Sequence, residues 1–222
     1  MSEVIITVRG EDETRIAPER ATAHVTVAGH GPDRQEVMDQ VLRLSEPVRD
    51  SISSRADGGP VAEWTSQRLS VSSQRPSSSD GKRLAVVHRA SIDFTATFTD
   101  SSELSLWTTE ISAWDGVQIG WVHWHLTPAT RARVEQEVAA SAVRVAIARA
   151  RAYAAALELT DVVPLEIADQ GLITSQHDMP AAPVAFAAKA MRAGAAASES
   201  AMEFRADDIT VSATVEGRFR AS

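Results

Sequence analysis

Apolar and polar residues alternate in steps of two along several stretches of the chain, which is typical of strands with one buried face. Residues 21–29 and 84–98 show this pattern most clearly, and residues 4–8 are rich in β-branched side chains. The same reasoning predicts strands at 65–76, 117–126, 162–171 and 207–219. The polar loop after residue 76 contains an Asp-Gly pair, so the strands on either side of it are expected to form a hairpin.

A period of about four residues replaces the alternation after Asp33. Asp33 is a good helix N-cap, and Glu36 three residues later completes a capping-box arrangement. The apolar residues that follow at helical spacing are Val37, Val41, Leu44 and Val48. Pro47 falls inside this pattern and is expected to end or kink the helix, because its ring clashes with the preceding turn.

Two further helices are predicted. The first is short, begins after Asp100 and carries Leu104, Trp107 and Ile111 on one face. The second is long and rich in alanine, with Thr127 as its cap, Pro128 in its first turn and an end near Leu159. The side chains expected to line its packed side are Val134, Val138, Val145, Ala148, Ala152 and Ala155.

These elements occur in the order ββαββ-αβαββ. Pairs of strands separated by helices indicate an α+β fold, with a mainly antiparallel sheet and helices packed on one face. We expect one domain over residues 1–222, with two α/β subregions at about 1–100 and 101–222. Residues 174–200 are rich in small side chains and poor in large apolar ones, so this segment is predicted to be mobile.

Composition narrows the classes of partner and chemistry. The net charge of -8 argues against nucleic acid as a partner, because nucleic-acid binding favours basic surfaces. The chain has no cysteine, which removes disulfides and thiolate chemistry. No apolar stretch approaches the roughly 20 residues of a membrane span. The N-terminus lacks the features of a signal peptide, so a cytoplasmic location is expected.

Several strings, taken in order, resemble the SIMPL-domain family. They are "ITVRGEDETRIAPERATAHVTV", "WTSQRLSVSSQRP", "VVHRASIDFTATF", "GVQIGWVHWHLTP" and "AIARARAYAAALEL", which together extend over nearly the whole chain. The family includes bacterial oxidative-stress proteins and periplasmic immunogens. The resemblance implies a link to stress tolerance and a tendency to self-associate. The shared motifs consist of glycines, a proline and inward-facing apolar residues, so the resemblance implies no catalytic residues.

The string "GWVHWHL" places two histidines two residues apart. On a regular strand, His123 and His125 share a face with Trp121, while Val122 and Trp124 lie on the other face and are expected to pack under the long helix. Two such histidines could reach one metal ion, but a metal site needs at least a third ligand, and no other histidine forms a spaced motif with this pair. An exposed or partner-covered strand face is the favoured interpretation, and no metal or other cofactor is expected.

The sequence contains no nucleotide-binding, zinc-protease or nucleophile-elbow motif. We therefore expect a non-enzymatic assembly or binding module. The alternatives are a protein-interaction adaptor, or a metal- or ligand-binding protein that uses the His123/His125 face.

Self-association into a homo-oligomer is also expected, for two reasons in the residues themselves. The strand at 117–126 has apolar residues on both faces, with Val117, Ile119 and Trp121 on one of them. The alanine-lined helix is suited to close packing against another surface. The most plausible partner or ligand face contains Trp121, His123 and His125.

Overall fold

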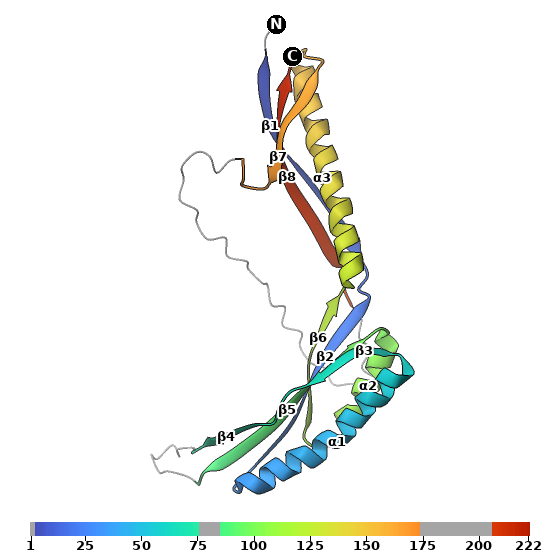
Figure 1. The fold of residues 1–222 in the computed structure, drawn as a ribbon, viewed down its shortest axis with the longest axis vertical. Helices are drawn as coiled ribbons and strands as arrows, with labels where there is room; N and C mark the ends of the chain where they lie inside the picture. The colour runs from blue at the N-terminus through green and yellow to red at the C-terminus, as the bar shows by residue number, and fades with distance from the viewer. Residues whose placement is uncertain (1–2, 76–84, 174–205) are drawn as a thin grey trace, which may run out of the picture. The chain divides into compact units, whose positions relative to one another are not determined.

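The computed structural model describes residues 3–75, 85–173 and 206–222 (Figure 1). The predicted mobile segment at 174–200 lies outside these residues. The described part contains three helices and eight strands. In chain order they are β1 (Val4–Ile16), β2 (Arg20–Gly31), α1 (Arg34–Gly58), β3 (Val61–Ser66), β4 (Ser70–Gln74), β5 (Val87–Phe98), α2 (Ser101–Ser112), β6 (Val117–His125), α3 (Pro128–Ala156), β7 (Val162–Asp169) and β8 (Ile209–Ala221).

The predicted fold class is confirmed, because helices cover antiparallel sheets in an α+β arrangement. The order contains one strand more than expected, since β3 and β4 occupy the region where a single strand was predicted. The predicted hairpin is present as antiparallel pairing of β4 with β5. None of the helices in the described residues is long and apolar enough to cross a membrane.

The chain forms two compact units. Over the described residues, the first combines residues 3–17, 127–173 and 208–222, and the second combines residues 18–75 and 85–126 with 206–207. These units do not coincide with the expected subregions of about 1–100 and 101–222, because the two ends of the chain fold together and the middle folds by itself. The division into two units does not test whether the 222 residues act as a single domain, so the single domain stays a prediction.

In the first unit, β1, β8 and β7 form an antiparallel sheet with β8 at its centre. β1 pairs with β8 along its whole length, from Val4 opposite Ala221 to Ile16 opposite Ile209. This pairing explains why β1 extends well beyond the predicted residues 4–8, because the polar segment that follows finds a complete set of backbone partners on β8. Pro164 lies in the edge strand β7, where its missing N–H removes no ladder bond from a central strand.

Helix α3 packs along this sheet (Figure 1), and Val134 and Val138 are buried as predicted, but beyond Val138 the buried side differs from the predicted one. Val145 is only half-buried, and Ala148, Ala152 and Ala155 are exposed. The buried residues occur every fourth position: Val134, Val138, Ala142, Ala146, Ala150 and Ala154. Residues four apart are offset by about 40° around a helix, so this stripe drifts around α3 and follows the twist of the strands beneath it.

The second unit contains a five-stranded antiparallel sheet in which β3, β5, β2 and β6 are successive neighbours and β4 also pairs with β5. Helices α1 and α2 bury their apolar residues against one face of it. Pro47 was expected to end or kink α1, yet the helix continues to Gly58. Pro47 is exposed, and the buried residues Val41, Val48 and Ile52 anchor the helix on both sides of it. Tertiary packing thus outweighs the lost backbone hydrogen bond.

Candidate functional site

The candidate site lies on the face of the five-stranded sheet that α1 and α2 leave uncovered, which we call the outer face. Among the strands that the structure describes, β6 is at the edge of this sheet and pairs only with β2. Ala23 of β2 lies opposite Val122 of β6, whereas Val25 lies opposite Ile119. One extra residue is therefore inserted in β6 opposite His24, which is a β-bulge at Gly120 and Trp121.

The bulge corrects the expectation that β6 has apolar residues on both faces. Val117 and Ile119, which precede it, pack into the same core as Val122 and Trp124, which follow it. Trp121 is therefore the one large apolar side chain of β6 that is exposed, at 62%. The expectation that Val122 and Trp124 pack under the long helix is wrong, because they join the core beneath α1 and α2, while α3 covers β1, β8 and β7.

The aromatic rings on the outer face form a continuous row. The indole of Trp121 stacks on the imidazole of His24, with ring centroids 3.8 Å apart and planes 21° from parallel. Trp121 also meets His123 edge-on, with ring centroids 6.0 Å apart. His123 in turn stacks with His125 at 5.3 Å. The predicted grouping of Trp121, His123 and His125 on one face is thus present, and His24 from the neighbouring strand belongs to it.

A hydrogen-bonded chain leads from His125 across the sheet. Its Nε2 lies 3.0 Å from the hydroxyl of Thr22, which lies 2.9 Å from the hydroxyl of Thr97. Thr97 donates to the carboxylate of Glu63 over 3.5 Å. The tautomer of the imidazole decides whether His125 or Thr22 donates, and either hydroxyl can donate between Thr22 and Thr97. The chain links β6, β2, β5 and β3 and fixes the His125 ring.

This arrangement bears on the metal hypothesis. Nε2 of His125 is engaged by Thr22, and its Nδ1 lies 3.3 Å from the carbonyl oxygen of Leu126. A metal ion would have to displace one of these partners. Over the described residues, no group of three or more histidines and acidic residues is placed to hold a metal ion. His123 and His125 thus lack a third ligand there, and the expected lack of bound metal stays a prediction.

Sequence reasoning identified three members of this site and missed His24, Thr22 and Thr97. The alternation along β2 did place Thr22 and His24 opposite the apolar residues. It could not reveal that β2 lies between β5 and β6, which brings residues 22, 97 and 125 together despite their separation in the chain.

Comparison with known proteins identifies the family. The model of the SIMPL family, described as proteins of unknown function (DUF541), matches residues 6–219. The match covers nearly the whole chain, so the chain belongs to the SIMPL family. No curated protein matches the sequence.

Proposed function

We propose that this member of the SIMPL family is a non-enzymatic assembly and binding module whose outer-face residues at β6 bind a second copy of the chain. The observation that carries the proposal is the exposure of Trp121 at the edge of a sheet. Trp121 is not an isolated apolar side chain, because its indole is continuous with the rings of His24, His123 and His125, and a contiguous exposed patch can mark an interaction site. Tryptophan is also enriched among the residues that dominate the energy of protein interfaces.

The surroundings of Trp121 favour binding. Stacking on His24 restrains the indole, so it loses little conformational freedom when a partner covers it. The nearby polar side chains already bond to one another, as in the pairs Thr22–Thr97 and Thr65–Thr95. A partner could therefore cover this face without leaving these hydroxyl groups unpaired, which is the main cost of burying polar surface.

A second copy is the proposed partner because β6 is an edge strand. Such a strand presents unpaired backbone groups that another strand can bond, and a two-fold axis beside β6 would place the same strand of both copies together. The alanine stripe of α3, expected to support self-association, gives no support, because α3 buries it within the chain. The proposal therefore rests on Trp121 and β6, together with the family resemblance.

The absence of enzymatic activity is part of the proposal and is supported by the site itself. The one hydroxyl beside an imidazole in this site is that of Thr22, which lies 3.0 Å from Nε2 of His125 but also bonds to Thr97, so it belongs to a hydrogen-bonded chain across the sheet and fits a structural role. A link to stress tolerance rests on the family resemblance alone. Comparing the peroxide sensitivity of a deletion strain with that of its parent tests this link. The cytoplasmic location stays a prediction.

Light scattering coupled to gel filtration tests self-association. We expect a mass above the 23.8 kDa of one chain, and Trp121→Glu should lower it, because a carboxylate buried without a partner opposes association. Leu106→Glu is the matched control, since Leu106 is 61% exposed but lies on α2, on the other side of the sheet. A mass equal to one chain at every concentration, or equal effects of the two variants, would contradict the proposal.

A protein-interaction adaptor is the alternative for the same surface. If the wild-type protein is monomeric, Trp121 would serve a different protein partner. A pull-down from native lysate with wild-type protein, with Trp121→Glu as the negative control, distinguishes this alternative. A ligand site at His123 and His125 is disfavoured by the bonds that already hold His125.

A further inference from the structure

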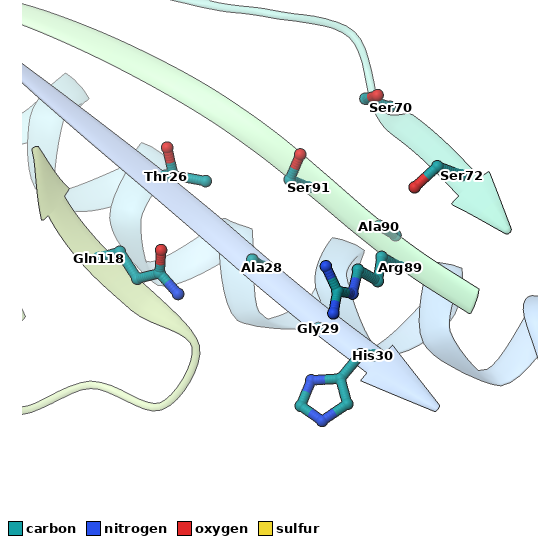
Figure 2. Close-up of a pocket in the computed structure, with 10 residues that line it drawn as sticks. All are labelled: Thr26, Ala28, Gly29, His30, Ser70, Ser72, Arg89, Ala90, Ser91 and Gln118. Atoms are coloured by element: carbon teal, nitrogen blue, oxygen red, sulfur yellow. The ribbon is translucent and has the colours of Figure 1, made fainter. Parts of the chain in front are cut away.

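A second feature of the outer face lies away from Trp121, where β2, β4, β5 and β6 line a shallow hollow of about 480 Å³ (Figure 2). The polar side chains that line it and enter the argument are Thr26, Ser70, Ser72, Arg89, Ser91 and Gln118. None of the residues lining it is acidic. The hollow shares the sheet with the proposed interface, but none of its lining residues belongs to the aromatic row.

The strand register explains why the sheet is hollow here. Ala28 of β2 lies opposite Ser91 of β5, and Ser91 lies opposite Ser70 of β4. Three small side chains therefore form one row across the sheet. The next row contains His30, Arg89 and Ser72, and the row on the other side contains Thr26 and Gln118. Because residues two apart share a face, larger side chains border the small central row.

The border supplies hydrogen-bond donors. Figure 2 shows the guanidinium of Arg89 extending from β5 over β2, while the amide of Gln118 reaches toward β2 from the opposite side. Arginine offers five N–H donors and no acceptor, and the amide and serine hydroxyls can donate as well. In the strand register, the carboxylate nearest to the hollow is that of Asp93, which lies opposite Thr26. It already accepts a hydrogen bond of 2.6 Å from Thr26.

Arg89 has a charge that the described part of the chain does not neutralise. The seven ion pairs found there involve other arginines, and Arg89 is exposed at the rim of the hollow. The protein as a whole is negative, with a net charge of -8, so general attraction does not draw anions to it. Any anion preference at this place must come from the local donors.

We propose that this hollow binds the oxyanion group of a small ligand, either a phosphate or a carboxylate. Arg89 supplies the positive charge, and its planar guanidinium can form two parallel hydrogen bonds to either group. Gln118 and the hydroxyls of Ser70, Ser72 and Ser91 supply further donors, and Ala28 leaves the space that the ligand occupies. This site is independent of self-association through Trp121, so either proposal can fail without the other.

Nuclear magnetic resonance titration of the ¹⁵N-labelled full chain with inorganic phosphate, and separately with acetate, tests the proposal at constant ionic strength. We expect saturable shifts in the amides of Ala28, Ser91 and Gln118 with at least one of the two anions, and the one that binds identifies the preferred group. Arg89→Ala should weaken binding by about tenfold or more, because it removes charge-assisted hydrogen bonds. Arg89→Lys should retain part of the affinity.

Two further variants complete the design. Ala28→Leu should abolish binding by filling the hollow while keeping Arg89, and Arg43→Ala on the exposed side of α1 is the control that should change nothing. The spectrum of each variant shows directly whether it is folded. Shifts that do not saturate with either anion, or that persist unchanged in Arg89→Ala and Ala28→Leu, would overturn the proposal.

Discussion

Gly10 of β1 lies directly against the backbone of Ala146 in α3. A Cβ atom built on Gly10 would be 2.6 Å from the Ala146 nitrogen and 2.9 Å from its Cβ, closer than real Cβ atoms come. The helix can approach the strand this closely because its buried residues from Ala142 to Ala154 are alanines and the facing strand residue has no side chain. The core of the first unit is therefore built on close backbone contact as well as on large side chains.

Gly10→Ala is accordingly expected to lower the free energy of unfolding by about 1–3 kcal/mol, the usual cost of overpacking a core. Chemical denaturation measures the effect. Gly58→Ala in α1 is the control, because a Cβ there meets only Pro60 at 3.8 Å. Alanine is also the better helix former, so the control should be neutral or slightly stabilising. An unchanged stability of Gly10→Ala would show that α3 does not approach β1 as described.

The buried side of α3 can be tested with a matched pair of alanines. Ala150 is fully buried and Ala152 is exposed, although the sequence pattern had placed Ala152 on the packed side. Ala150→Leu should destabilise the protein by about 1–3 kcal/mol, since the added atoms have no space. Ala152→Leu should change stability by no more than about 0.5 kcal/mol. Thermal unfolding of the two variants distinguishes the sides, and the opposite ranking would restore the original assignment.

The cap of α1 provides a third prediction. The Asp33 carboxylate accepts hydrogen bonds from the backbone N–H groups of Gln35 at 2.8 Å and Glu36 at 3.0 Å. Asp33→Ala should cost about 1 kcal/mol of stability, because it leaves these helix-end donors without their partner. Asp33→Asn keeps an accepting oxygen and should lose much less. Equal losses in the two variants would show that the cap hydrogen bonds are not the cause.

The fourth prediction concerns metal. We expect no stoichiometric zinc, copper or nickel in the protein purified at neutral pH, because His125 is already hydrogen-bonded through both ring nitrogens. Elemental analysis by mass spectrometry measures this directly. One equivalent of metal that disappears when His123 and His125 are both replaced by alanine would show that this prediction is wrong.

The sequence by itself determined the type of most elements and the positions of several helix ends. Asp33, Asp100 and Thr127 cap the three helices as predicted, because capping depends on a side chain and the backbone within three residues of it. Alternation along β2 and β5 also gave the buried faces of both strands correctly. These features are local, so the pattern of residues along the chain contains them.

Tertiary structure decided the rest, because each remaining feature depends on residues that are far apart in the chain. The extension of β1 depends on β8 at the opposite end, and the buried side of α3 depends on the approach of Gly10. The bulge at Trp121 depends on pairing with β2, and it alone turns Val117 and Ile119 inward while leaving the indole exposed. A run of alanines or alternating residues permits more than one face to pack, and only the partner strand selects which face does.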